Sequence, residues 1–82
     1  MMRDGVYAVL RENGRLPFPV EQLNATDDLF AAGLDSAAAV DVMLALEERF
    51  GIEIPERLLT RRAFSSVAAL EQLVSEAAAA AA

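Results

Sequence analysis

The chain has 82 residues and a formal net charge of −6, with 13 acidic residues, 7 basic ones and no histidine or cysteine. A chain of this length forms one small domain, which we assign to residues 1–82. The acidic balance argues against nucleic acid as a partner, because a basic face is needed to release counterions from phosphates. No apolar run is long enough to cross a bilayer and no signal peptide is recognisable, so we expect a cytoplasmic protein without membrane contact.

The first predicted helix spans about Met2 to Glu12, where Val6 and Leu10 recur at helical spacing before the stop signal Asn13-Gly14. The two prolines in residues 16–20 prevent the helix from continuing. A long loop follows, and its apolar residues are expected to attach it to the core. These residues are Leu16, Val20, Leu23, Leu29 and Phe30. Long loops that are held in this way are usually functional.

The second predicted helix runs to Phe50, with Asp35 or Ser36 as its N-cap and Gly51 as its C-cap. Apolar side chains along it predict a buried stripe. The stripe consists of Val40, Met43, Leu46 and Phe50, with help from Val42. Residues 52–55 (Ile-Glu-Ile-Pro) alternate like a strand but find no strand partner in the chain, so we predict an extended link.

The rest of the chain is predicted to form one short helix and one long helix. The short helix covers about Glu56 to Thr60, and Ser65 or Ser66 caps the long one. Apolar residues repeat along the long helix at Val67, Leu70, Leu73 and Val74. The alanine tail, residues 77–82, can extend this helix without packing against anything and is expected to fray. The predicted fold is all-α, a small four-helix bundle of three longer helices and one short helix.

Ser36 is the candidate functional residue, because its hydroxyl lies at a helix start beside the carboxylate of Asp35. Nucleophilic catalysis by serine needs a general base, and the chain has no histidine, cysteine or lysine. Paired carboxylates such as Asp27-Asp28 are more simply explained as solvated surface acids, and the spacing of a calcium loop does not occur. We therefore expect no catalytic residue, no metal site and no enzyme. Something other than the chain itself therefore has to modify Ser36, although serine is also a commonplace N-cap.

Acidity is concentrated around the second helix. Residues 27–56 hold eight acids and one arginine, a local balance of −7 that leaves +1 for the rest of the −6 total. Helical spacing places Ala37, Asp41, Leu44 and Glu48 on one face, where an apolar residue lies between acids. Such a face suits a basic partner surface with a small apolar socket. An ordinary solvated helix side is the simpler alternative.

Three pieces of sequence occur in a fixed order. They are residues 28–36 (Asp-Leu-Phe-Ala-Ala-Gly-Leu-Asp-Ser), then Val40, then residues 46–55 (Leu-Glu-Glu-Arg-Phe-Gly-Ile-Glu-Ile-Pro). Together they resemble the acyl carrier protein family, whose pattern is a (D/E)-L-x-x-x-G-x-D-S turn, a second helix ending E-E-x-F and an I-x-I-P link. The resemblance covers nearly the whole chain, and the ordered succession is far more specific than any single piece.

The resemblance implies that Ser36 accepts 4'-phosphopantetheine from coenzyme A through a phosphodiester, and that the terminal thiol then holds cargo as a thioester. A helix N-terminus favours a nearby phosphate, which agrees with this expectation. The resemblance also implies that Gly33 supplies backbone freedom in the turn and that Asp35 contacts the modifying enzyme.

The implied partners are a phosphopantetheinyl transferase, an acyl or amino acid:carrier-protein ligase and a downstream acyl-accepting enzyme. The expected contact residues are Asp35, Asp41, Leu44, Glu47 and Glu48. The carrier itself is expected to be a monomer.

The chain departs from many fatty-acid carriers at Ala37 and Ala38, where those proteins have a large apolar residue and an acid. Residues 16–20, 31–34 and 58–66 resemble instead a smaller group of standalone bacterial carriers. That group is similar to aminoacyl carrier proteins, which are charged with glycine or alanine by truncated homologues of class II seryl-tRNA synthetases. The last of these segments contains Arg61 and Arg62, which either take part in docking to a partner or are simply surface charges.

Two other functions remain compatible with the sequence. The first alternative is a specialised carrier of a fatty acid, a polyketide or a peptide-synthetase substrate. It is chemically permitted because the thioester belongs to the arm and the partner enzyme selects the acid. In the second, the chain is a non-carrier helical module that binds a basic partner through its acidic face.

Overall fold

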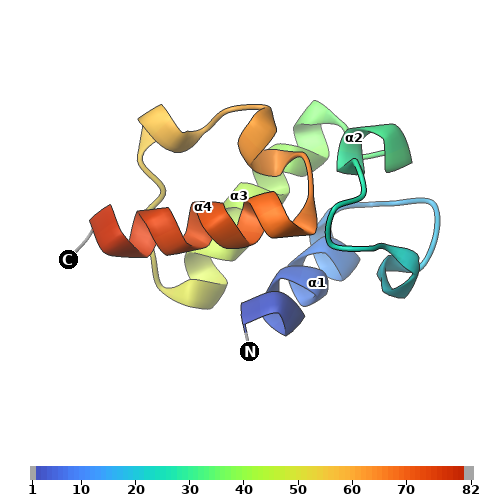
Figure 1. The fold of residues 1–82 in the computed structure, drawn as a ribbon, viewed down its shortest axis with the longest axis horizontal. Coiled ribbons are helices and arrows are strands. Elements are labelled where there is room, and N and C mark those ends of the chain that lie inside the picture. The colour runs from blue at the N-terminus through green and yellow to red at the C-terminus, as the bar shows by residue number, and fades with distance from the viewer. Residues whose placement is uncertain (1, 81–82) are drawn as a thin grey trace.

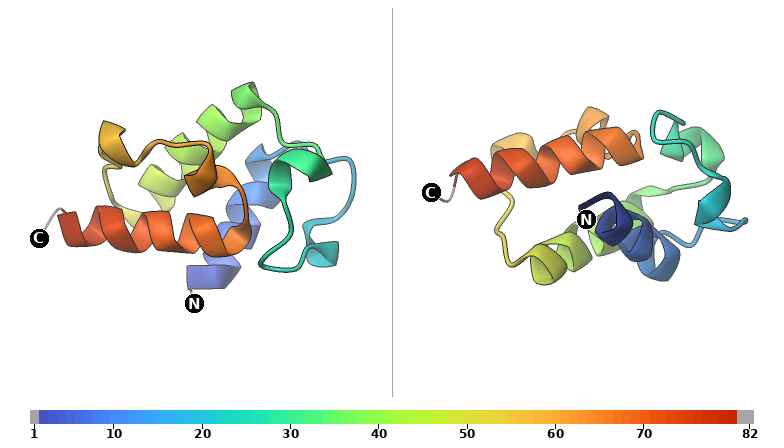
Figure 2. Two further views of the ribbon diagram at one scale, coloured as in Figure 1. Left: turned by 45° about the horizontal axis from the view of Figure 1, so that its top comes forward. Right: turned by 60° about the horizontal axis from the view of Figure 1, so that its bottom comes forward.

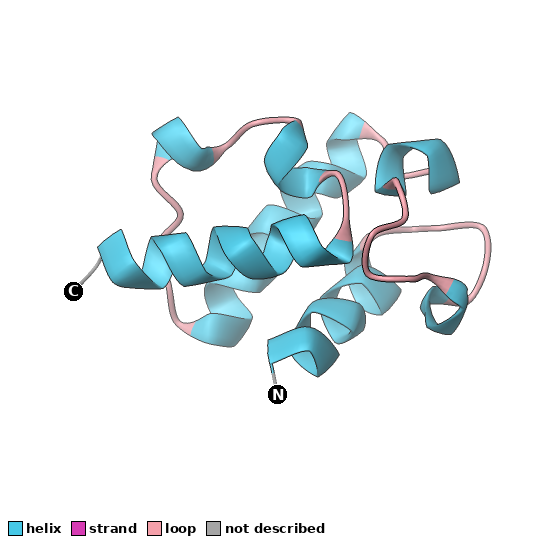
Figure 3. Cartoon of the chain, in the orientation of Figure 1, coloured by secondary structure: helices cyan, strands magenta, loops and turns pink. Residues whose placement is uncertain are grey.

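The computed structural model describes residues 2–80, which form helices and connecting loops without a strand (Figure 3). The three longer helices are α1 (Met2–Asn13), α3 (Ser36–Phe50) and α4 (Val67–Ala80). A short helix α2 (Leu29–Ala32) lies in the first long connection. Three 3-10 turns complete the chain: η1 (Val20–Gln22), η2 (Glu56–Leu58) and η3 (Arg62–Phe64). The all-α fold of three longer helices and one short helix is confirmed, but the short helix is α2, which lies in the connection that the sequence predicts to be a loop.

The helices form two layers. Helix α1 packs against both α3 and α4, and α4 lies across the pair (Figures 1 and 2). The long connection between α1 and α3, which contains η1 and α2, curls around the end of the molecule opposite the C-terminus (Figure 1). Along residues 2–80, none of the helices combines the length and apolar character needed to cross a membrane.

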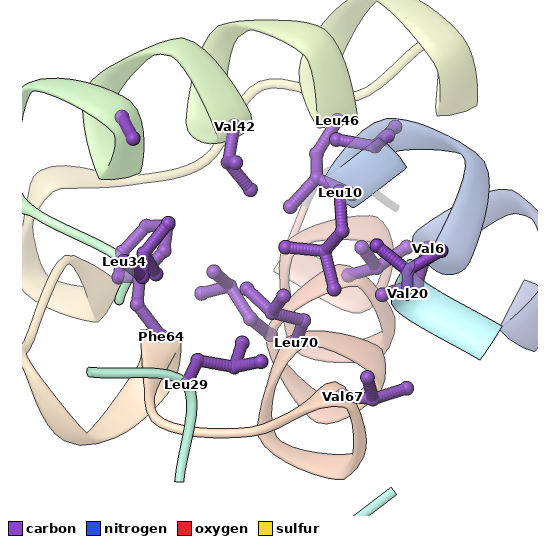
Figure 4. Close-up of a cluster of buried hydrophobic side chains, with 14 of the residues drawn as sticks. Val6, Leu10, Val20, Leu29, Leu34, Val42, Leu46, Phe64, Val67 and Leu70 are labelled. Atoms are coloured by element: carbon purple, nitrogen blue, oxygen red, sulfur yellow. The ribbon is translucent and has the colours of Figure 1, made fainter. Parts of the chain in front are cut away.

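The core lies between the three longer helices, where their aliphatic side chains converge (Figure 4). Leu10 from α1, Leu46 from α3 and Leu70 from α4 are at most 1% exposed. Burying one such side chain contributes about 1.5–3 kcal/mol. The expected attachment of the first loop is confirmed, because Val20, Leu23 and Leu29 belong to this core while Leu16 and Phe30 pack against it half-buried.

The predicted buried stripe of α3 is wrong at Val40, which is 53% exposed. The buried residues of this helix are Ala38, Val42 and Leu46, with Met43 and Phe50 half-buried at the edge. The rotation of the helix follows from Leu34, which is buried immediately before the helix begins. Four-residue steps from Leu34 keep the following side chains on the core side.

The segment after Pro55 also differs from the prediction. In place of a helix over residues 56–60 there is only the 3-10 turn η2, which buries no residue, followed by η3. With no buried side chain to anchor it, a longer helix would gain little from forming here. Of the two predicted caps for the last helix, Ser66 is the one used, and its Oγ accepts a hydrogen bond from the Ala69 amide at 3.0 Å.

The alanine tail contributes to packing, contrary to the prediction. Ala77 is fully buried, and α4 continues through Ala80. A methyl group facing the core here still removes apolar surface from water, so the first alanine of the run is a core residue. Residues 81 and 82 of the tail lie outside the described residues.

Ion pairs on the surface connect segments that are distant in sequence. Arg3 pairs with Glu71 and so joins α1 to α4, while Arg11 pairs with Glu21 and joins α1 to η1. The hydrogen bond from Arg11 stabilises the carboxylate and holds the pKa of Glu21 below its usual range. Both pairs are exposed, so we assign most of the fold's stability to the core.

Candidate functional site

The turn before α3 is built by residues 28–34, and it requires a glycine. Asp28 caps α2, since its Oδ1 accepts hydrogen bonds from the amides of Phe30 at 2.9 Å and Ala31 at 3.3 Å. Gly33 then ends α2 with a φ of 124°, a conformation that L-residues rarely adopt. A Cβ at this position would also lie 3.0 Å from Cδ of Pro17. The glycine therefore allows both the reversal of the chain and the close approach of the first loop.

Asp35, rather than Ser36, is the N-cap of α3. The Ala38 amide donates a 2.8 Å hydrogen bond to Oδ1 of Asp35, and Ser36 is the first residue of the helix. The Ser36 hydroxyl is thus not needed for capping, and its side chain is exposed. The sequence motif places Ser36 where a helix N-terminus, with its unsatisfied amides and positive dipole end, meets solvent.

A small open cavity of about 220 Å³ lies beside Ser36, and sequence reasoning missed it. Ser36 and Ala39 of α3 form one wall, Phe30 of α2 another, and Arg61 and Phe64 a third. The Leu29 amide donates to the Ser65 carbonyl oxygen at 2.8 Å, which ties α2 to the chain at the end of η3. The Arg61 guanidinium carbon stacks 3.9 Å from the centre of the Phe30 ring.

The predicted acidic face of α3 is exposed, but its acids differ in their surroundings. Leu44 is 53% exposed, and Glu48 is exposed beside it on the same face. Asp41 forms an ion pair with Arg15, with 2.7 Å between the charged atoms. Oε2 of Glu47 accepts a 2.9 Å hydrogen bond from the Ile54 amide. Asp41 therefore helps to hold the loop after α1, and Glu47 holds the link after α3.

Val40 joins this face, although its spacing in the sequence predicts a core position. Ser36, Val40 and Leu44 follow each other at four-residue intervals and are all exposed. This spacing is visible in the sequence, but Val42 offers an equally good apolar residue for the core. The result is an apolar line that runs along α3 from the serine, flanked by acids.

The arrangement suits covalent attachment better than catalysis. Ser36 has an accessible hydroxyl at a helix start, and the side chains that share its cavity include no general base. The donors near it, the helix N-terminus and the Arg61 guanidinium, fit an anionic phosphate group joined to the serine oxygen. Within residues 2–80, no three carboxylates are grouped in a way that could hold a metal ion.

Comparison with known proteins agrees with this arrangement. The family described as "Phosphopantetheine attachment site" matches residues 10–74. An aminoacyl carrier protein of Agrobacterium fabrum (strain C58 / ATCC 33970) is 44% identical over 73 residues, which cover 89% of this chain and 88% of that protein.

Two solved structures are similar over most of the chain. One contains an engineered Bradyrhizobium japonicum glycine:[carrier protein] ligase complexed with a carrier protein from Agrobacterium tumefaciens and AMP. The matched chain of this structure has a TM-score of 0.87 and is 42% identical in sequence. The match covers 89% of this chain and 97% of that one. The other is a solution structure from Agrobacterium tumefaciens, with a TM-score of 0.72 and 42% identity over 90% of this chain and 89% of that one. The chain therefore belongs to the phosphopantetheine attachment site family and is a carrier protein, not an enzyme.

Proposed function

We propose that Ser36 is the attachment site of 4'-phosphopantetheine and that the cargo is an amino acid such as glycine or alanine. The observation that carries the attachment site is the exposed hydroxyl of Ser36 at the first residue of α3, with the capping task left to Asp35. This serine lies within the residues that match the family. When bound, the arm supplies the thiol that holds the cargo as a thioester, which a chain without cysteine lacks.

The residues around Ser36 serve to present its hydroxyl. Gly33 and Leu34 reverse the chain and anchor it in the core, and Asp35 fixes where the helix begins. The serine oxygen consequently projects from a rigid helix end and not from a mobile loop. The helix dipole and the free amides of the first turn favour the negative charge of a phosphodiester at this position.

The partners contact the carrier through the exposed face of α3. They are a phosphopantetheinyl transferase, an amino acid:carrier-protein ligase and an enzyme that accepts the cargo. The predicted contact residues are Asp35, Asp41, Leu44, Glu47 and Glu48. Of these, Leu44 and Glu48 are the most available to a partner. Asp41 and Glu47 already have partners within the chain, so we expect Leu44 and Glu48 to contribute more to docking.

The amino acid cargo is supported by the similarity to an aminoacyl carrier protein and by the name of the ligase in the similar complex. The chain's alanines at positions 37 and 38 also distinguish it from many fatty-acid carriers. We further propose that residues 1–82 form a single carrier domain in the cytoplasm, where ATP and coenzyme A are available for loading and attachment. The single core and the extent of the family match support the domain assignment.

Mass spectrometry tests the attachment site. The protein expressed with a phosphopantetheinyl transferase is expected to gain the mass of one phosphopantetheine, and Ser36→Ala is expected to abolish this gain. Ser75→Ala, which changes an exposed serine on α4, is the matched control and should be modified like the wild type. A wild-type protein that gains no mass with several transferases would refute the assignment.

A loading experiment tests the cargo. The modified protein is incubated with ATP, a candidate ligase and either single amino acids or single fatty acids, and the mass of the thioester is read. We expect glycine or alanine to be loaded. Loading by fatty acids, with no amino acid accepted from any ligase of this type, would overturn the aminoacyl assignment while leaving the attachment site intact.

A further inference from the structure

One of the side chains that line the cavity beside Ser36 is an arginine, Arg61, whose guanidinium contacts an aromatic ring. Arg61 and Phe30, which stack with 3.9 Å between the guanidinium carbon and the ring centre, both line this cavity together with Ser36. Within residues 2–80 the ion pairs formed by arginine involve Arg3, Arg11 and Arg15, and Arg61 is not one of them. Its charge is therefore not neutralised by a carboxylate of this part of the chain.

Stacking leaves the hydrogen-bond donors of a guanidinium available. The central carbon of the Arg61 guanidinium lies 3.9 Å from the centre of the ring, and the N–H bonds of a guanidinium that stacks on a ring point outward in its own plane. An arginine held against a ring loses side-chain freedom before any ligand arrives, which lowers the entropic cost of binding. Its planar pair of donors matches the oxygens of a phosphate.

We propose that Arg61 is the phosphate-binding residue of the prosthetic group, and that Phe30 positions it for this task. The inference rests on the proposed attachment at Ser36, because the phosphodiester on that oxygen would begin at the wall of the cavity that Arg61 shares. The occupant of the cavity is thus the phosphate end of the arm.

The helix N-terminus is a weaker site for this phosphate than its position suggests. The Asp35 carboxylate already accepts the hydrogen bond of the Ala38 amide and places a negative charge at the same helix end. A phosphodiester adds another negative charge to a chain whose net charge is already −6. A nearby guanidinium offsets this repulsion, and Arg61 shares the cavity with Ser36.

The first test observes Arg61 directly by NMR. Nitrogen-labelled protein is compared before and after modification, with the mass spectrum showing that attachment is complete. We expect the Nε–Hε signal of Arg61 to shift and its exchange with water to slow, while the signal of Arg62 stays in place. Arg62 is the matched control because it is the next residue, is also exposed and lines a different cavity.

The second test measures thermal unfolding of the unmodified and modified forms of each variant. In Arg61→Gln the modified form is expected to melt about 2 °C lower, relative to its unmodified form, than in the wild type. Arg62→Gln, which removes the same charge, should follow the wild type, and Arg61→Lys should recover part of the difference. In Phe30→Leu the bulk remains but the ring is lost, so the shift of the Arg61 signal should become smaller.

The outcomes separate this inference from the proposed function. If Ser36 never gains mass, the attachment site and the role of Arg61 both fail. If Ser36 is modified but the Arg61 signal does not move, and Arg61→Gln melts like Arg62→Gln, only the role of Arg61 is refuted. If Phe30→Leu behaves like the wild type, the positioning role of the ring is refuted.

Discussion

Asp35 combines a structural task and a proposed functional one in a single side chain. Its carboxylate accepts the hydrogen bond that caps α3, at 2.8 Å from the Ala38 amide, and it precedes the serine that we propose is modified. The sequence motif identifies both residues but leaves open which of them is the cap. Either side chain is a good N-cap, so only the backbone path after Leu34 distinguishes them.

Substitution of Asp35 separates the two tasks. Asp35→Asn keeps an oxygen that can cap the helix, so the free energy of unfolding should change by less than about 0.5 kcal/mol, whereas Asp35→Ala should lose about 1 kcal/mol. Both variants lose the charge, so both should be modified several-fold more slowly by the transferase. Urea unfolding and the time course of the mass gain measure these effects.

The interpretation of the cap would fail if Asp35→Asn were destabilised as much as Asp35→Ala. The proposed contact with the transferase would fail if Asp35→Asn were modified at the wild-type rate. Because the two readouts are independent, a stability effect cannot be mistaken for a docking effect.

At the scale of the element, α3 is the clearest case in which the limits are predictable and the orientation is not. Its start follows to within one residue from the two possible caps Asp35 and Ser36, and its end at Phe50 follows from Gly51, whose φ of 63° is the left-handed conformation of a C-cap. Between them almost every residue from Ala37 to Leu46 is apolar. A helix with so little polar contrast has several sides that could face a core.

A matched pair of valine substitutions tests the orientation of α3. Val40 is 53% exposed and Val42 is fully buried, so the same change should have different costs. Val40→Ala should alter the free energy of unfolding by less than about 0.5 kcal/mol, and Val42→Ala should lower it by about 2 kcal/mol. Chemical denaturation of both variants measures this difference. Equal losses would mean that α3 turns a different side toward the core.

On the scale of the whole molecule, the core is unevenly distributed. The helices α1, α3 and α4 and the first loop contribute the buried side chains, whereas η2 contributes none and Leu59 is 37% exposed. The chain from Glu56 to Arg62 is therefore the least firmly attached part of the described residues. This segment borders the cavity beside Ser36, where we propose that the arm begins.

Native-state hydrogen exchange tests this distribution. Amides near Val42, Leu46 and Leu70 should exchange only when the whole domain unfolds, and amides of residues 56–62 should exchange through local opening. We expect the second group to exchange at least tenfold faster at low denaturant concentrations. Protection of the segment around Arg61 equal to that of α3 would contradict the assignment.

Local chemistry accounts for what the amino-acid sequence determines by itself. The serine, its glycine turn, the helix ends and the family pattern all depend on residues close together in the chain, such as a cap beside the helix that it begins. These signals locate Ser36 and the limits of the longer helices. They also indicate the all-α class, since the only alternating segment, residues 52–55, lacks a partner.

Long-range packing accounts for the rest. The buried side of α3, the burial of Ala77 and the stacking of Arg61 on Phe30 each join residues from different elements. No local signal specifies such contacts, because several faces of an apolar helix and several conformations of an exposed arginine are nearly equal in energy until a neighbour is present. The position of Ser36 can therefore be predicted from the sequence, whereas the position of Arg61 beside it is determined only when α2 and η3 come together.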